Sequence, residues 1–207
     1  MATLIDHPCV QHKLSLIRDK EVGHKQFREL ATEITKFICY EALKNIKTKD
    51  ILVKTPVAEA KCKQLDNDLV VIPILRAGVG MLEGILELVP TARVGFVGMY
   101  RDEDTKMPVT YYERFPKQVK GGTCIIIDPM LATGGSTIDA INKLKENRAG
   151  NIVVVCIVTC PEGIAVVEAE HPDVSIFAAA IDDKLNEKKY IVPGLGDAGD
   201  RLFGTSA

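Results

Sequence analysis

The sequence predicts an α/β protein with a mostly parallel central sheet flanked by helices. Four apolar runs lack the alternation of a half-exposed strand: 69–75, 124–127, 152–158 and 174–180. Such runs are typical of strands that are covered on both faces. Segments with apolar residues at helical spacing separate them, and alternating strands and helices favour a parallel sheet. The 207 residues fit a single domain.

Composition excludes several classes of protein. Apolar residues make up 46% of the chain and charged residues 26%, which is enough for a large core and argues against disorder. The formal net charge is only −2, so there is no broad basic surface of the kind that nucleic acid requires. No apolar run approaches the roughly 18 residues of a membrane span, and the N-terminus lacks the pattern of a signal peptide. We therefore expect a cytoplasmic protein with no nucleic-acid partner and no membrane partner.

The six cysteines include no C-x-x-C pair, and several lie in apolar runs. Reduced, mostly buried thiols are the expected state. Cys156, Cys160 and His171 could be imagined as a metal cluster, but buried core thiols are the favoured interpretation.

Residues 1–66 are predicted to form an N-terminal helical extension. The first 20 residues have mixed polarity and suggest an arm. Between Phe27 and Ala42, apolar residues fall on one face of a helix. Residues 45–66 are rich in lysine and are predicted to be irregular, with charges that only solvate a surface.

The run 69–75 is the first predicted strand, and Pro73 within it favours an edge or a bulge. A turn with glycines at 78 and 80 follows, and then a helix that ends before Pro90. Arg76 lies at the carboxyl end of this buried strand. In open α/β sheets, that end is where ligands bind.

Residues 97–116 are predicted to form a β-hairpin arm. A strand from 94 to 99 leads to Arg101, and 109–115 has the β-branched and aromatic residues of a second strand. The hairpin tip is expected near 103–107. The arm suits either an active-site lid or an oligomer contact.

The segment 124–150 predicts a buried strand, a phosphate-sized loop and a helix. Asp128 follows the strand, a loop of Gly, Thr and Ser residues extends to Ser136, and helical spacing begins thereafter. Successive N–H groups beside a helix N-terminus suit a phosphate. Ser136 and Asp139 resemble a capping box, and Gly150 is the expected residue just after the helix.

The tail from 189 to 207 begins with a short strand and continues into a stretch with three glycines, a proline and two aspartates. Flanking apolar residues favour a tethered loop over a disordered end. Before it, a helix from Pro161 and a strand at 174–180 complete the alternation.

Two common phosphate loops do not fit. A nucleoside-triphosphate loop requires a lysine after its last glycine, whereas Gly135 is followed by Ser136. A dinucleotide turn requires a third glycine after Gly78 and Gly80, where Glu83 stands. What remains is a strand, an acid and then A-T-G-G-S, with amides for a terminal monophosphate and an acid for sugar hydroxyls.

Three segments carry a resemblance to a known family: 73–78 (PILRAG), 127–136 (IDPMLATGGS) and 190–201 (YIVPGLGDAGDR). The second resembles the phosphoribosyl-diphosphate loop of type I phosphoribosyltransferases. All three together resemble the uracil-using members, and the similarity extends over nearly the whole chain. Most of the superfamily has two adjacent acids before the loop, but here Pro129 follows Asp128, as in uracil-specific members.

The resemblance implies transfer of the phosphoribosyl group of 5-phosphoribosyl 1-diphosphate (PRPP) to uracil N1, giving UMP and diphosphate in pyrimidine salvage. The implied catalytic residues are Asp128, Arg76 and Arg101. Mg²⁺ is the implied cofactor, held mainly by substrate and waters, with Asp197 as a candidate contact. The residues implied to bind PRPP are Arg76, Ala77, Arg101, Asp128, Pro129, Met130, Leu131, Ala132, Thr133, Gly134, Gly135, Ser136, Thr137 and Asp197. Those implied to bind uracil are Ile191, Gly196, Asp197 and Ala198, through the backbone of Ile191, Gly196 and Ala198 above all.

No general base is evident, since the four histidines lie far from these segments in sequence. Catalysis is therefore expected to rest on positioning and on leaving-group electrostatics. Either the 97–116 hairpin or residues 182–189 would close over the site. The resemblance also suggests a homodimer or larger homo-oligomer, and GTP as an effector.

Two alternatives remain open. One is a regulator that keeps the fold, senses nucleotides and binds RNA; it should have a basic face, and the near-neutral charge speaks against it. The other is a sister enzyme acting on a purine or orotate, which Pro129 speaks against.

Overall fold

The computed structural model describes residues 2–66, 68–101 and 108–205, and it is built around one nine-stranded sheet. From one edge to the other, its strands are β1 (Ala2–Leu4), β11 (Ser175–Ile181), β10 (Asn151–Thr159), β8 (Thr123–Ile127), β4 (Leu69–Leu75), β6 (Phe96–Arg101) and β7 (Pro108–Arg114). Two short strands lie off this path: β5 (Arg93–Val94) pairs with β4, and β9 (Met130–Leu131) pairs with β10. The pairings are parallel except that of β6 with β7. The predicted parallel sheet is confirmed.

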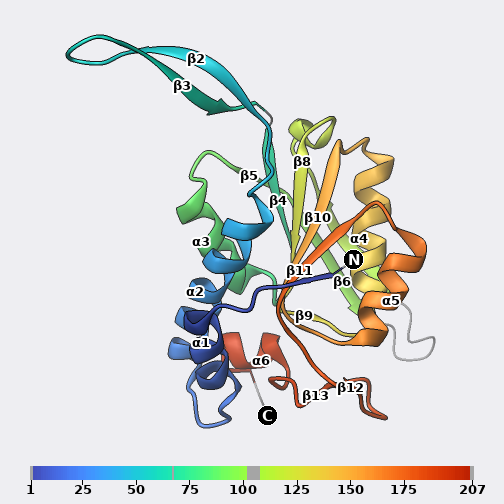
Figure 1. Ribbon diagram of the computed structural model, residues 1–207. Coiled ribbons are helices and arrows are strands. Elements are labelled where there is room, and N and C mark those ends of the chain that lie inside the picture. The colour runs from blue at the N-terminus through green and yellow to red at the C-terminus, as the bar shows by residue number, and fades with distance from the viewer. Residues whose placement is uncertain (1, 67, 102–107, 206–207) are drawn as a thin grey trace.

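Helices cover both faces of the sheet (Figure 1). On one side lie α1 (Pro8–Arg18), α2 (His24–Ala42) and α3 (Val79–Leu88), and on the other α4 (Gly135–Glu146) and α5 (Pro161–Glu170). In β4, Val71 belongs to the core of the first side, while Val70 and Ile72 belong to that of the second. Two buried faces leave no polar side to the strand, which is why the apolar runs do not alternate.

Pro73 does not mark an edge, because β4 lies between β8 and β6. Its backbone faces the same side as that of Val71, whose carbonyl accepts from Gly95 N at 2.9 Å. On that side, β5 ends at Val94 and β6 begins at Phe96. The missing N–H of Pro73 therefore falls at a break between two partner strands.

The prediction of irregular chain at 45–66 is wrong. Strands β2 (Thr48–Lys54) and β3 (Glu59–Leu65) form a regular antiparallel hairpin that projects away from the body of the protein (Figure 1). Nearly every side chain in these strands is exposed or half-buried. Without a buried face there was no selection for alternation, so the sequence shows no strand pattern.

The first residues are not a free arm. β1 pairs in parallel with β11, and Ala2 lies opposite Ile176. Helix α1 begins at Pro8 after His7, whose Nδ1 accepts from the backbone of Cys9. Its buried residues are Val10, Leu14 and Ile17.

Helix α4 is capped differently from the prediction. Its N-cap is Gly134 in the left-handed region (φ 83°), and Asp139 instead accepts from Thr110 Oγ1 on β7 at 2.8 Å. At the other end, Arg148 takes the left-handed conformation (φ 60°), and Ala149 N donates to Leu144 O. This is a Schellman ending in which arginine occupies the place expected for Gly150.

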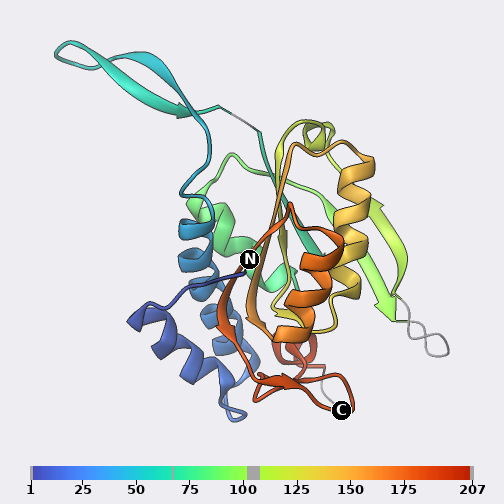
Figure 2. The same cartoon turned by 45° about the vertical axis from the view of Figure 1, so that its right-hand side comes forward.

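The tail is ordered and ends in a helix that the sequence pattern did not indicate. β13 (Ile191–Val192) pairs with β12 (Lys184–Leu185), and α6 (Ala198–Phe203) follows. In α6, Leu202 is fully buried and contacts the start of α3 at Gly80. In the 45° turned view, the tail curls beneath the sheet near the lower ends of the strands (Figure 2).

The predicted hairpin at 97–116 corresponds to β6 and β7, which form one edge of the main sheet. Its expected tip, 103–107, lies outside the described residues. No helix in the described part of the chain is both long and apolar enough to cross a membrane.

Candidate active site

The predicted site residues follow the carboxyl ends of neighbouring strands. Ile127 of β8 lies opposite Pro73 of β4, so Asp128 and Arg76 come one and three residues after this pair. The peptide bond between Leu75 and Arg76 is cis. A Cβ on Gly78 would approach Ile127 O to 2.4 Å, so glycine is required where the turn after β4 meets the end of β8.

The loop after Asp128 is held to the sheet by its carbonyl oxygens. Pro129 O accepts from Ile157 N and Val158 N at 3.1 and 3.0 Å. Leu131 O accepts from Thr159 Oγ1 at 3.0 Å, and Ala132 O lies 3.5 Å from the thiol of Cys160. With these carbonyls turned to β10, the loop is fixed before any ligand arrives.

The N-terminus of α4 offers free donors to an anion. The N-cap Gly134 makes no side-chain capping bond. In any α-helix the first N–H groups have no partner within the helix, and these are the amides of Gly135, Ser136 and Thr137 here. Together with the positive end of the helix dipole, they suit a phosphate.

The surroundings of Asp128 raise the pKa of its carboxyl. Its carboxyl is half-buried and accepts from Met130 N at 3.3 Å. Burial raises its pKa to about 7; the Met130 amide lowers the pKa, and the charge of Asp197 raises it. The carboxyl can therefore exchange its proton near neutral pH.

Arg76 connects this edge to the tail. Its side chain is largely exposed, and Nη2 lies 3.5 Å from Asp200 Oδ1. A Cβ on Gly199 would lie 3.7 Å from Arg76 Nη2 and 3.3 Å from Asp197 Oδ1, so these groups surround one small space. Two segments more than 120 residues apart thus meet at the strand ends.

The predicted uracil-binding residues lie on both sides of one turn. Ile191 and Ala198 are buried, whereas Gly196 is exposed and has φ 78°. Asp197 caps α6: its Oδ1 accepts from Asp200 N at 2.9 Å. Ala77 joins the cluster at 4.0 Å from the Cβ position of Gly199.

Arg101 is the last residue of β6, and Gly98 of that strand lies opposite Leu75. Its backbone is therefore at the same edge as Arg76. The position of its side chain lies outside what the structure describes.

Three residues that the sequence analysis missed hold the tail in place: Arg18, Asp182 and Arg201. Arg18 donates to both carboxylate oxygens of Asp182 and to Gly194 O. Arg201 donates to Leu195 O and to Ile17 O, and its guanidinium lies 4.4 Å from the centroid of the Phe27 ring. One signal was available, because Asp182 directly follows a buried strand as Asp128 does.

The donors fit a magnesium ion that is bound largely by substrate. Asp128 and Asp197 are close enough for the charge of one to raise the pKa of the other, and carboxylates are ligands that Mg²⁺ favours. Among the described residues, no group of three or more His, Cys, Asp or Glu side chains could hold a metal. One or two carboxylates with substrate oxygens and water match the usual habit of Mg²⁺.

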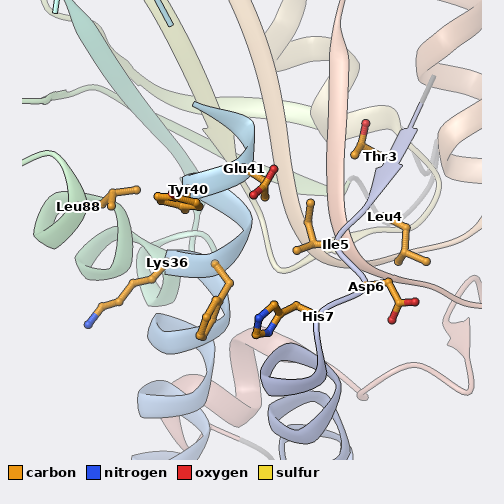
Figure 3. Close-up of a pocket in the computed structure, with 10 residues that line it drawn as sticks. Thr3, Leu4, Ile5, Asp6, His7, Lys36, Tyr40, Glu41 and Leu88 are labelled. Atoms are coloured by element: carbon orange, nitrogen blue, oxygen red, sulfur yellow. The ribbon is translucent and has the colours of Figure 1, made fainter. Parts of the chain in front are cut away.

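A cavity of about 630 Å³ lies elsewhere, between the start of the chain and α2 (Figure 3). It is bordered by Leu4, Ile5 and Tyr40, and the ring of His7 stacks on that of Phe37 with 5.5 Å between centroids. None of the predicted site residues lines it.

Comparison with known proteins gives a consistent answer. The family model described as uracil phosphoribosyltransferase matches residues 4–205. Proteins of that name from Shouchella clausii and Dictyoglomus thermophilum are 54% and 52% identical to the chain. The first alignment covers 98% of this chain and 97% of the relative, the second 99% and 100%.

Solved structures agree with the fold. The AQ2163 protein of Aquifex aeolicus superposes with a TM-score of 0.95 at 38% identity, over the whole of both chains. An orotate phosphoribosyltransferase from Mycobacterium tuberculosis, in complex with PRPP, has a TM-score of 0.53 at 13% identity, covering 86% of this chain and 91% of that one. The latter likeness concerns the fold alone. From the family match and the identities over nearly its full length, the chain belongs to the uracil phosphoribosyltransferase family.

Proposed function

We propose that the protein transfers the phosphoribosyl group of PRPP to N1 of uracil, giving UMP and diphosphate in pyrimidine salvage. The observation that carries this proposal is the meeting of a phosphate-type loop, an arginine and a glycine-rich tail at one edge of the sheet. The chain's membership of a family named for this activity supports it. In the reaction, the bond from C1′ to the diphosphate oxygen breaks, the bond from N1 to C1′ forms, and the N1 proton is released.

The loop from Asp128 to Thr137 would bind the 5′-phosphate and the ribose. The amides of Gly135, Ser136 and Thr137 at the start of α4 would receive the phosphate dianion. Ionised Asp128 would accept hydrogen bonds from ribose hydroxyls. As the C1′ bond breaks, the same carboxylate would stabilise positive charge on the oxocarbenium-like ring.

Arg76 and Arg101 would meet the charge that develops on diphosphate. Arg76 is exposed at the strand ends, and only one carboxylate contact of 3.5 Å to Asp200 restrains it among the described residues. A guanidinium can donate hydrogen bonds to two phosphate oxygens at once, which suits a leaving group. Mg²⁺, held by substrate oxygens with Asp128 or Asp197 nearby, would add positive charge at the same place.

The backbone of Ile191, Gly196 and Ala198 would bind the base. Uracil presents one donor, N3–H, and two acceptors, O2 and O4, which backbone carbonyls and amides can match. Cytosine reverses the pattern at N3 and C4 and would leave backbone groups unpaired. A site built in this way can discriminate by about 10⁴.

One assay tests the activity. UMP formation is measured with PRPP, Mg²⁺ and, in turn, uracil, cytosine, orotate and hypoxanthine. We expect turnover with uracil. For each of the other bases, kcat/KM should be lower than that for uracil by a factor of about a thousand or more. Absence of uracil turnover would refute the proposal, and RNA binding by a protein without turnover would favour a regulator.

We also infer a homodimer or a larger homo-oligomer. Supporting this, Leu52 and Val57 of the β2–β3 hairpin are 69% and 95% exposed on an element that stands clear of the body (Figure 1). Exposed apolar side chains on a projecting hairpin are typical of a contact surface. GTP as an effector and a cytoplasmic location rest on the family resemblance and the composition.

A further inference from the structure

The proposed base-binding loop, residues 191–198, lies mostly outside regular secondary structure, because α6 begins only at its last residue. β13 contributes two residues of strand, and the loop contains glycines with positive φ at 194 and 196. A Cβ on Gly194 would approach Ile191 O to 2.2 Å, so the turn closes tightly on itself. A site that reads a base through backbone atoms needs this turn in one conformation.

The peptide of Gly194 is held by two charged side chains. Its N–H donates to Asp182 Oδ2 at 2.8 Å, and its carbonyl accepts from Arg18 Nη1 at 2.7 Å. Arg18 also donates to both oxygens of the same carboxylate, at 2.8 and 2.6 Å. The two side chains and the glycine therefore form a closed set of four hydrogen bonds.

The pair is anchored at both ends. Asp182 is 6% exposed and follows β11, where its own N–H donates to Thr159 O at 2.8 Å. Arg18 is the last residue of α1, whose buried side chains pack into the core. A bidentate pair fixes the orientation of both side chains. Asp182 and Arg18 therefore hold the Gly194 peptide in a fixed position relative to the sheet and α1.

We propose that Asp182, oriented by Arg18, is a positioning residue that fixes the base-binding loop and thereby sets the affinity for uracil. Neither side chain is assigned a contact with substrate. The inference rests on the proposed function, because it takes 191–198 as the site of the base.

The expected effect is confined to one substrate. Asp182→Asn keeps the size of the side chain but loses one acceptor and its charge, so Gly194 and Arg18 no longer have complete partners. We expect the KM for uracil to rise about tenfold or more while the KM for PRPP changes less than about twofold. Arg18→Lys keeps the charge but not the two-pronged geometry and should give a smaller rise in the same direction.

Two controls separate positioning from loss of stability. Glu33→Gln makes the same chemical change in the ion pair that Glu33 of α2 forms with Lys13 of α1; among the described residues, neither side chain bonds to the loop. Leu14→Ala removes buried volume from α1 and should lower the thermal midpoint. Neither variant should change the ratio of the two KM values.

The wild-type assay comes first, because absence of UMP formation would remove the proposed function before any variant is made. With an active wild type, an unchanged KM for uracil in Asp182→Asn and Arg18→Lys would overturn the positioning role. An equal rise in the KM for uracil and the KM for PRPP would also overturn it. So would a Leu14→Ala variant that has the same thermal midpoint as Asp182→Asn and the same ratio of the two KM values. If Asp182→Asn does not fold, Arg18→Lys decides alone by the same criteria.

Discussion

Asp128 shows how one residue depends on its surroundings. The sequence places it after a buried strand, and burial at that position raises its pKa to about 7. The ionised carboxylate accepts hydrogen bonds from ribose hydroxyls most strongly, and burial in the free protein shifts the group toward its protonated form. Substrate binding therefore acts on a carboxyl that titrates in the working range.

This pKa predicts a pH dependence of activity. As pH falls through about 7, Asp128 takes up a proton, so kcat/KM for PRPP should decline with an apparent pKa near that value. In Asp128→Asn, turnover should fall and this acid limb should disappear. Initial rates from pH 5.5 to 9 in both proteins test the prediction, which an identical acid limb in the variant would contradict.

The same carboxyl should destabilise the free protein at high pH. Its folded pKa, about 7, lies above the ordinary value of 3.8, so its contribution to stability is complete below about pH 3.8 and is lost as pH rises through 7. Asp128→Asn should therefore raise the free energy of unfolding at pH 8 by about 1–3 kcal/mol, and by less at pH 5. Urea unfolding without substrate measures this, and a variant less stable than wild type at pH 8 would contradict it.

At the scale of elements, the phosphate loop depends on the helix beside it. A Cβ on Gly163 of α5 would approach Ala132 O to 2.4 Å and Leu131 O to 2.7 Å. Both atoms belong to backbone that is already bonded to β10 or its end, so the loop cannot move without losing hydrogen bonds.

Gly163→Ala should therefore displace the loop without touching any substrate. We expect a rise of roughly tenfold in the KM for PRPP with a smaller effect on the KM for uracil. Steady-state kinetics with each substrate varied in turn provides the measurement. Ala165→Ser, at an exposed position of the same helix, is the control; equal kinetics in the two variants would show that the loop tolerates the extra methyl group.

Helix α6 follows the proposed base-binding loop directly. Leu202 is fully buried against the start of α3 at Gly80, and Asp197 caps the helix. Leu202→Ala should lower stability by about 2–5 kcal/mol and raise the KM for uracil more than that for PRPP. Val10→Ala, a buried truncation in α1, serves as the comparison, and a uracil effect no larger than in that variant would argue against a role for α6 in the base site.

At the scale of the whole molecule, the site and the β2–β3 hairpin lie at opposite ends of the sheet (Figure 1). The hairpin therefore does not cover its own site, and its exposed apolar residues are available to another copy of the chain.

Leu52→Glu should weaken self-association. Placing a charge among apolar contacts disfavours an interface, so the dimer dissociation constant should rise at least about tenfold. Sedimentation over a range of concentrations measures it. Lys54→Glu, a charge change on the same exposed strand, is the control, and a monomeric wild type would contradict the premise.

The sequence pattern was enough to predict those elements whose conformation depends on neighbouring residues. The apolar runs gave the buried strands, the glycines and Asp128 gave the loop, and helical spacing gave α2, α3 and α4, because each depends on neighbouring residues. Cap details were less predictable. Gly134 is the N-cap of α4, where a capping box from Ser136 was expected, and Arg148 takes the left-handed conformation that was expected of Gly150.

The β2–β3 hairpin escaped prediction because strands without a buried face carry no apolar signal. Helix α6 escaped because six residues are too few for a helical period to show. The sequence could not show that Pro73 lies in a central strand. The reason is that β5 and β6 both pair with the same side of β4, and Pro73 falls at the break between them.

The sequence by itself determined the fold class, the strand, loop and helix between 124 and 150 and, through its likeness to a family, the reaction. Only the tertiary structure decided that Arg18 and Asp182 hold Gly194, and that Arg201 ties the tail to α1. The physical reason is distance along the chain. A loop signature is written in consecutive residues, whereas a bidentate pair between residues 164 positions apart exists only once the chain has folded.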